Sequence, residues 1–360
     1  MRRALFLLLF IAVVFAASSK LPFEYFIAPA GEGNNRNSEA DMVVLRDGRV
    51  LLAWIDFYTS AGSDWGSARI SAKVSRDKGE TWGDKFTLQE NIGEMNVMEP
   101  DLLRLKSGKI LFLFCRKNSP ADCAPMVRVS SDDAKTFSAP KPMAITPSPS
   151  YTGFNHDRAI QLKTGRILMP VFYTTDYRVD PRIRSRVYYS DDEGGSWKPS
   201  ETILDLPQTK HGAQEPGVIE LKDGRVMLWV RTELGRIYKS YSKDRGVTWS
   251  DLEAVANLDS PLSPQSIKRH PMTGDLVLVW NNSPGPKRWP LTAAISKDEG
   301  LTWTHVKNVD ETANATFAYT SIEWLKDRAL LTYYVEQQPR VKEPRWSLKL
   351  KAVPLDWFYQ

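Results

Sequence analysis

The chain has 360 residues, of which 42% are hydrophobic and 25% charged, and this composition is ordinary for a globular protein. The formal charge is +5 at pH 7, a mild excess that suits an anionic substrate, but lysine and arginine are scattered and form no stripe of the kind that binds nucleic acid. Two cysteines exclude a disulfide-rich scaffold and a cysteine-based metal finger.

The first segment begins with Met1, Arg2 and Arg3 and continues as an apolar run from residue 4 to 17. The run is too short to cross a bilayer and ends in small residues, which predicts a cleaved signal peptide over residues 1–18. The alternative is a membrane anchor, which is disfavoured because no later segment has a comparable apolar run. Residues 19–360 are expected to form a single domain that is monomeric, secreted or periplasmic, and not inserted in a membrane after cleavage.

A hairpin pattern repeats along the rest of the chain. Each copy is an apolar, β-rich run, a tight turn and a second apolar run, as in "MVVLRDGRVLLAW" from residue 42. Further clear copies start at residues 102, 159 and 218, and weaker ones at 266 and 321. Asp-Gly, Ser-Gly and Thr-Gly turns between such runs are typical of β-hairpins. The pattern therefore predicts six hairpins.

A second pattern, S-x-D-x-G-x-T-W, lies between consecutive hairpins. It begins at Ser75, Ser190, Ser242 and Ser296, and a degraded copy begins at Ser130. Serine and aspartate side chains can bond the backbone of their own turn, and glycine takes the left-handed position. These boxes are therefore predicted to be scaffold and not catalytic groups.

One four-stranded unit in every 50 to 60 residues, repeated six times, predicts an all-β, six-bladed β-propeller with Asp-box turns. The sixth unit lacks a box. Its outer strands are expected from "RWSLKLKAV" near the C-terminus and "FEYFIAP" near the mature N-terminus, which would close the ring.

If the hairpin turns and boxes share one rim, the loops that lead into each first strand lie on the opposite rim. Counting back nine residues from each turn, with small adjustments in the last two units, gives one position per unit. These positions are Glu39, Glu99, His156, Glu215, Ser263 and Tyr319. Ionisable groups at one level around one axis predict a functional site there.

The boxes between hairpins resemble the Asp-box (BNR) repeats of the exo-α-sialidase, or neuraminidase, superfamily, from about residue 34 to 335. The resemblance implies that Tyr319 is the nucleophile, Glu215 its paired glutamate and Asp64 the acid/base. It also implies that Arg231 and Arg288 are the second and third arginines that bind the substrate carboxylate.

Elementary chemistry explains these residue types. A sialic acid carries a carboxylate on its anomeric carbon, which would repel a carboxylate nucleophile but not a neutral phenol. Tyrosine has a pKa near ~10, so Tyr319 needs Glu215 to accept its proton. Arginine binds a carboxylate through two parallel hydrogen bonds. No metal and no cofactor are required.

The sequence departs from the family at the first arginine, because Ser38, Glu39 and Ala40 stand in place of its Arg-Ile-Pro motif. Arg36, two residues upstream, is the candidate substitute. The segment "NHDRAIQL" is unexplained: its polar residues could bind hydroxyl groups, hold each other, or join Glu39 and Glu99 around a cation. The predicted substrate-binding residues are Arg231, Arg288, Arg36, Glu39, Glu99, His156, Asp157 and Arg158.

The leading hypothesis is a secreted, sialidase-like exo-glycoside hydrolase that releases terminal sialic acid, or a related acidic sugar, from glycoconjugates by a retaining mechanism. One alternative is a non-catalytic propeller that binds glycans. Another is a lyase or metal-assisted hydrolase of acidic polysaccharide that uses Glu39, Glu99 and His156. Cys115 and Cys123 could pair or remain thiols.

Overall fold

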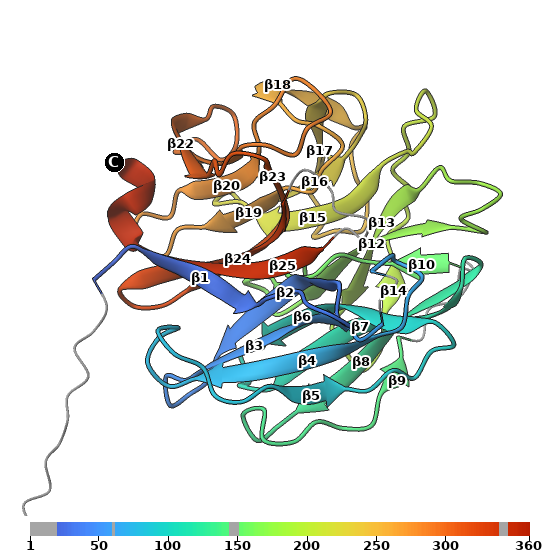
Figure 1. Ribbon diagram of the computed structural model, residues 1–360. Helices are drawn as coiled ribbons and strands as arrows, with labels where there is room; N and C mark the ends of the chain where they lie inside the picture. Colours follow the sequence, from blue (N-terminus) through green and yellow to red (C-terminus); the bar gives the residue numbers. More distant parts are fainter. Residues whose placement is uncertain (1–19, 60–61, 144–150, 338–344) are drawn as a thin grey trace, which may run out of the picture.

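The computed structural model describes residues 20–59, 62–143, 151–337 and 345–360 (Figure 1). The predicted signal peptide lies outside these residues. The described part of the chain is all-β except for one short 3-10 helix, η1 (Leu355–Tyr359), so the all-β part of the predicted fold is confirmed. No helix in this part is long and apolar enough to span a membrane.

The described strands group into four sheets. The first contains β1 (Phe23–Ala28), β2 (Arg36–Val44), β3 (Val50–Phe57), β4 (Ala68–Ser75), β5 (Phe86–Gln89), β23 (Ala315–Trp324), β24 (Arg328–Gln337) and β25 (Trp346–Pro354). The second contains β6 (Asn96–Arg104), β7 (Ile110–Ser119), β8 (Asp122–Ser130), β9 (Lys141–Pro142), β10 (Tyr151–Gly153), β11 (Ile160–Gln161), β12 (Ile167–Thr174), β13 (Arg184–Ser190) and β14 (Lys198–Pro199). The third contains β15 (Gln214–Glu220), β16 (Val226–Arg231), β17 (Arg236–Ser242) and β18 (Glu253–Asp259), and the fourth β19 (Ser266–Arg269), β20 (Leu276–Asn281), β21 (Leu291–Ser296) and β22 (Thr304–Asp310).

The six predicted hairpins are confirmed as antiparallel pairs β2–β3, β6–β7, β11–β12, β15–β16, β19–β20 and β23–β24. In the third unit the first strand is interrupted, because β10 and β11 both pair with β12 but are separated by residues 154–159. Three amides of this segment bond to side chains instead of to β12. Asp101 Oδ2 accepts from Arg158 N and Ala159 N, and Glu99 Oε2 accepts from His156 N.

The Asp boxes form the predicted turns. In the first box, Ser75 Oγ accepts a hydrogen bond from Gly79 N at 2.8 Å, and Asp77 Oδ1 accepts one from Thr81 N at 2.8 Å. The degraded box closes in the same way, and Ala134 takes the left-handed conformation of the missing glycine, with φ of 63°. The boxes also contact hairpin turns of neighbouring units, as in the bond from Lys222 N to Glu299. Boxes and hairpin turns therefore share one rim.

The first and last units of the chain belong to one sheet, seen at the blue and red ends of the colour scale in Figure 1. β25 pairs with β24 along nearly its whole length, and β1 adds to the other edge of β25. A single parallel pairing, Arg36 with Trp346, connects β25 to β2. The expectation that the two terminal segments complete the sixth unit is confirmed.

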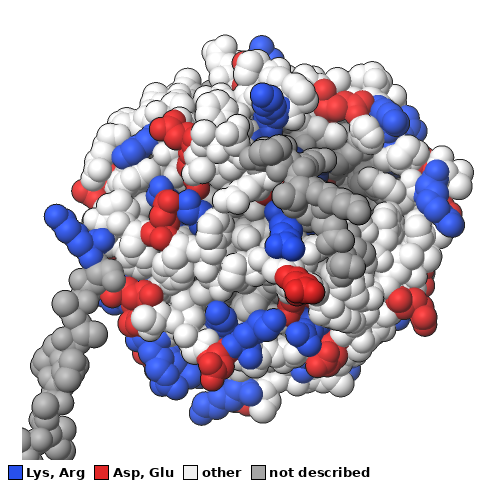
Figure 2. All heavy atoms as spheres, in the orientation of Figure 1, with Lys and Arg blue, Asp and Glu red and all other residues white. Residues whose placement is uncertain are grey.

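The hydrophobic core lies between adjacent units. One buried cluster, for example, packs Val43 and Leu51 of the first unit against Leu102 and Phe112 of the second. Such clusters position the first strands of successive units side by side. On the face shown in Figure 2, basic and acidic side chains are interspersed.

Candidate functional site

A cavity of about 680 Å³ lies at the ends of the first strands, away from the hairpin turns, and residues from both halves of the chain line it. A shared backbone feature directs side chains into it. At Glu39, Glu99, Glu215 and Tyr319 the pairing register shifts, as at a β-bulge, and φ is positive, between 39° and 60°. Residues other than glycine rarely adopt this conformation, and it concentrates at functional sites. Four of the six positions counted from the sequence are therefore equivalent in structure.

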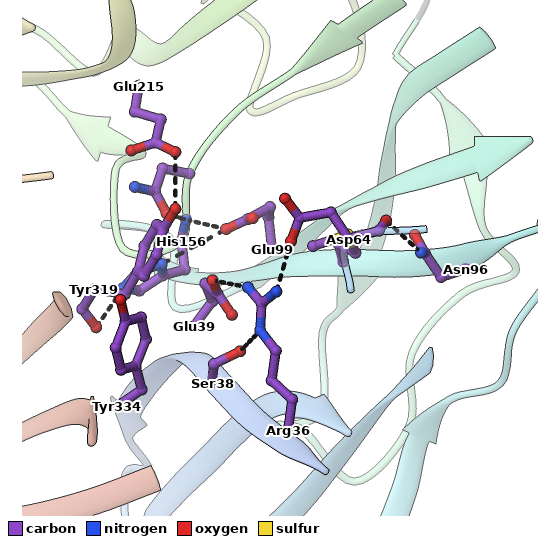
Figure 3. Close-up of polar contacts among 12 residues, drawn as sticks. Arg36, Ser38, Glu39, Asp64, Asn96, Glu99, His156, Glu215, Tyr319 and Tyr334 are labelled. Carbon is purple, nitrogen blue, oxygen red and sulfur yellow. Dashed lines mark hydrogen bonds and ion pairs between the residues drawn. The ribbon is translucent and has the colours of Figure 1, made fainter. Parts of the chain in front are cut away.

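Tyr319, Glu215 and Arg231 form one hydrogen-bonded cluster on the cavity wall (Figure 3 labels the first two). Tyr319 Oη donates to Glu215 Oε1 at 3.1 Å, and Arg231 Nη1 donates to Glu215 Oε1 at 2.8 Å and to Tyr319 Oη at 3.3 Å. Burial and the Glu215 carboxylate raise the pKa of Tyr319 well above its ordinary value, although Arg231 and Arg288 oppose this. The phenol is therefore neutral, next to a carboxylate that can take its proton.

Arg288 lies on the same wall, in the segment before β21. Its guanidinium carbon is 5.8 Å from the Tyr319 ring centre, and Nη1 donates to Tyr334 Oη at 2.8 Å. Nη2 donates to the carbonyl oxygen of Leu262 at 3.1 Å. Its charge is thus held by neutral groups, which leaves it able to attract an anion in the cavity.

Arg36 does reach the cavity, but protein groups occupy all three of its nitrogens. Nε donates to Ser38 Oγ, Nη1 to Asp64 Oδ1 at 2.6 Å and Nη2 to Glu39 Oε1. The guanidinium also lies over the rings of Phe57 and Trp346, at 4.9 and 5.8 Å. Arg36 is therefore fixed in place and largely neutralised by two carboxylates.

Asp64 lies at the cavity with its side chain 59% exposed. Desolvation by the surrounding walls acts to raise the pKa of Asp64, but the charges of Arg36 and Lys117 outweigh it and hold the pKa at about 2. Asp64 is consequently an ionised carboxylate at neutral pH.

Three other predicted substrate-binding residues do not line the cavity, and these expectations are corrected. His156 is fully buried beneath Tyr319, and its Nε2 bonds to the Tyr319 carbonyl oxygen at 3.1 Å. Arg158 is buried between units and donates to Gln265 O and Ser266 Oγ. Asp157 faces a second cavity at the hairpin-turn side and is paired with Lys268. The interrupted strand at residues 154–159 is the reason, since it breaks the count from the turn.

Ser263, the position counted in the fifth unit, is also buried and bonds Asn281.

The sequence reasoning missed several residues that line the cavity. Lys117 donates to the Asp64 carbonyl oxygen at 2.9 Å, and its Nζ lies 4.8 Å from the Trp65 ring. Trp65 packs edge-on against Tyr177 at 6.0 Å, and Tyr334 bonds Arg288. The only available signal was position, because Trp65 follows Asp64 and Lys117 lies near the end of β7, the second strand of its hairpin.

Neither a metal-ligand cluster nor a disulfide is found among the described residues. No group of three or more histidine, cysteine, aspartate or glutamate side chains there has an arrangement that could hold a metal ion. Cys115 and Cys123 are buried thiols and form no disulfide.

The buried glutamates predict a fall in stability with rising pH. Burial raises the pKa of Glu39 to about 7 and those of Glu99 and Glu323 to about 8, against about 4.3 in an unfolded chain. Between these values the folded state holds protons that the unfolded state has lost, so the free energy of unfolding falls as pH rises. His156 acts in the opposite direction. Burial lowers its pKa to about 4, so it makes the free energy of unfolding rise with pH, but only up to the ordinary histidine pKa near ~6.5.

Urea unfolding at pH 6.5 and 8.5 should therefore show a loss on the order of 4–5 kcal/mol, and Glu99→Gln should reduce that loss. A flat profile in the wild-type protein would contradict the assignment.

The family to which this chain belongs follows from its match to a known family model. The model of the BNR repeat-like domain matches residues 48–330. The chain belongs to the BNR repeat-like family. Its predicted place in the exo-α-sialidase superfamily is thereby confirmed, although the family alone does not fix a reaction.

Among curated proteins, this BNR repeat-like chain is 27% identical to a sialidase of Bacteroides fragilis over 211 residues, which are 54% of this chain and 36% of the relative. It is 29% identical to a Vibrio cholerae sialidase over 161 residues, 37% of this chain and 20% of the relative. The matches thus span about a third or less of the curated relatives.

Solved structures of similar fold cover nearly the whole chain. A protein of unknown function from Dyadobacter fermentans has a TM-score of 0.74 at 18% identity, covering 91% of this chain and 98% of that one. A Hadza microbial sialidase has a TM-score of 0.73 at 18% identity, with coverage of 92% and 68%. Trypanosoma rangeli sialidase in complex with the inhibitor DANA has a TM-score of 0.71 at 16% identity, with coverage of 92% and 59%. At these identities the likeness establishes the fold of this family member.

Proposed function

We propose that the chain is a sialidase-like exo-glycoside hydrolase that releases a terminal sialic acid, or a related acidic sugar, from glycoconjugates. The observation that carries the proposal is the hydrogen bond of 3.1 Å between Tyr319 Oη and Glu215, flanked by Arg231 and Arg288. A phenol next to a proton acceptor and two cations suits attack on a carbon that bears a carboxylate. The names of the similar proteins favour the same substrate class.

The reaction is proposed to retain the anomeric configuration. Tyr319 Oη attacks the anomeric carbon and passes its proton to Glu215 while the glycosidic bond breaks. Water then displaces the phenol oxygen, which recovers its proton. Arg231 and Arg288 hold the substrate carboxylate. The resemblance implies three arginines for this task, but here only two are available, because Arg36 is bound by Glu39 and Asp64. The resemblance assigns the acid/base step to Asp64, which faces the same cavity.

The proposal includes two features of the whole molecule. The six hairpin units would be the blades of a closed six-bladed propeller, supported by the contacts of β2 with β6 and β23, and of β19 with β15 and β23. The protein would be a monomer. The signal peptide expected over residues 1–18 would direct its export, so that it is secreted or periplasmic.

The direct test is hydrolysis of a fluorogenic sialoside by the wild-type protein, with and without EDTA. Turnover that is indifferent to EDTA is expected. Loss of turnover on adding EDTA would favour a metal-assisted hydrolase, and ultraviolet-absorbing unsaturated products from a uronic-acid polysaccharide would favour a lyase. Saturable sialoside binding without turnover would favour the glycan-binding alternative, for which the occupied fork of Arg36 is the supporting observation.

Arg288→Ala should raise KM for an acidic sialoside by about 10- to 100-fold, because one charge-assisted contact with the substrate carboxylate is lost. Arg288→Lys should recover only part of the loss, since lysine has no fork. The matched control is Arg269→Ala at the opposite rim, where Arg269 pairs with Glu299. Equal KM values for the Arg288→Ala and Arg269→Ala variants would exclude Arg288 from carboxylate binding.

A further inference from the structure

Five carboxyl-bearing side chains that differ in their partners line the candidate cavity: Glu39, Asp64, Glu99, Glu215 and Glu336. Glu336 accepts a hydrogen bond from Thr316. Glu39 and Asp64 pair with Arg36, and Glu215 pairs with Arg231. Within the described chain, no lysine or arginine lies within ion-pair distance of Glu99, whose only ion-pair neighbour of any kind is the ring of His156, at 3.6 Å from Nδ1. A carboxyl group among other carboxylates and without a cation keeps its proton more readily than its neighbours do.

The tautomer of His156 also favours a protonated Glu99. Nε2 bonds to the carbonyl oxygen of Tyr319, and because a carbonyl only accepts, Nε2 carries the hydrogen. In the neutral ring Nδ1 is then a bare acceptor, and this atom is buried without a hydrogen-bond partner. A lone pair directed toward Glu99 disfavours a carboxylate there and suits a protonated carboxyl that can donate to it.

Glu99 is also placed for contact with a ligand. Its backbone has the same left-handed conformation as Glu215 and Tyr319, with φ of 58°, and its side chain is 15% exposed on the cavity wall. Figure 3 shows the Glu99 carboxyl between Asp64 on one side and the Tyr319–Glu215 pair on the other. A sugar whose anomeric carbon lies over Tyr319 would therefore pass Glu99 before it reaches Asp64.

Asp64 is poorly suited to give up a proton, since Arg36 binds its carboxylate at 2.6 Å and is itself held by Ser38, Glu39 and two aromatic rings. Where the surroundings of two nearby carboxyl groups differ in this way, one group can act as a proton donor while the other remains an anion.

We propose that Glu99, and not Asp64, is the catalytic residue that donates the proton to the leaving group in this glycoside hydrolase. The inference rests on the proposed function. In the first step the Glu99 O–H proton moves to the glycosidic oxygen, which takes the electron pair of the breaking C–O bond, while Tyr319 Oη bonds to the anomeric carbon and its proton goes to Glu215. In the second step the Glu99 carboxylate takes a proton from water, the water oxygen bonds to the anomeric carbon, and the phenol leaves with the proton held by Glu215. Asp64 remains an anion that stabilises positive charge developing on the sugar.

The electrostatic surroundings agree with this role. Burial, followed by repulsion from Glu215, raises the pKa of Glu99 to about 8, so the group is protonated at neutral pH but can ionise. The titratable and charged groups that face it are Glu215, Asp64, Glu39, Arg36, His156, Cys115 and Arg158.

The test compares two sialosides that differ only in the leaving group. An alkyl sialoside needs protonation of its leaving oxygen, whereas a 4-methylumbelliferyl sialoside releases a stable anion and does not. Glu99→Gln should lower kcat/KM for the alkyl sialoside by about 10²- to 10⁴-fold and for the aryl sialoside by less than about 10-fold, and the alkaline limb of the pH profile should disappear. Glu323→Gln, which changes a buried glutamate at the opposite cavity, is the control and should change neither value.

A leaving-group-dependent loss in Asp64→Asn, with none in Glu99→Gln, would overturn the assignment in favour of Asp64. A wild-type protein that hydrolyses neither sialoside would overturn the proposed function itself, and the two failures are thus distinguishable. Infrared difference spectroscopy at pH 7 provides a readout independent of turnover. The wild type should show a protonated-carboxyl C=O band that Glu99→Gln lacks and Asp64→Asn retains, and the absence of such a difference would also overturn the assignment.

Discussion

Tyr319→Phe should lower kcat/KM for a fluorogenic sialoside by at least about 10³-fold, because it deletes the nucleophile and leaves the carboxylate-binding arginines in place. The affinity for a non-hydrolysable sialic acid analogue should change by less than about 10-fold, since a phenyl ring fills the same space. Loss of the hydroxyl removes one bond to Glu215 and one from Arg231, but these two residues still pair with each other.

The matched control is Tyr333→Phe. Tyr333 is a buried tyrosine of the same unit whose hydroxyl bonds Asp310 at 2.9 Å and does not face the cavity. This variant should keep wild-type turnover while losing about 1 kcal/mol of stability. Turnover by Tyr319→Phe at a rate near that of the control would rule out a tyrosine nucleophile.

Asp101→Leu should also have a large effect and destabilise the fold by about 2–4 kcal/mol. Asp101 is buried, and its Oδ2 accepts the amides of Arg158 and Ala159 at 2.6 and 2.8 Å. Leucine would leave two buried N–H groups of the third unit without acceptors, and each unsatisfied group costs about 1–3 kcal/mol. Urea unfolding monitored by tryptophan fluorescence measures the loss.

Asp101→Asn is the informative comparison, because its amide oxygen can still accept both bonds at nearly the same size. It should cost much less than Asp101→Leu. Equal destabilisation by the two substitutions would mean that the charge of Asp101, and not its acceptor role, holds the second and third units together.

The repeated turns were predictable from the sequence because their chemistry is local. Ser75, Asp77 and Gly79 determine their own turn within eight residues, and the same reasoning holds for the degraded box around Ala134. Counting back from the hairpin turns, which are equally local, placed Glu39, Glu99, Glu215 and Tyr319 correctly, since strand pairing carries a fixed register from one end of a hairpin to the other.

Prediction failed where long-range contacts replace local ones. In the third unit Asp101 and Glu99, both from the preceding unit, accept hydrogen bonds from the amides of residues 156, 158 and 159, and no local pattern reveals this. The sequence also identified Arg36 as a substitute for the missing arginine, but its engagement by Glu39 and Asp64 depends on three segments meeting in space. The pairing of Asp64, but not of Glu99, with an arginine depends on the same long-range contacts.

The placement of β25 has a consequence for synthesis. β2 and β3 emerge from the ribosome early, yet β25, the strand that joins them to the sixth hairpin, is synthesised only after all six hairpins. Earlier units can collapse as they appear, but the sheet that β25 shares with β1 and β2 cannot form before β25 is made. Nascent chains should therefore stay protease-sensitive at β1 and β2 until β25 has emerged, and its emergence should protect β1, β2 and β24 together.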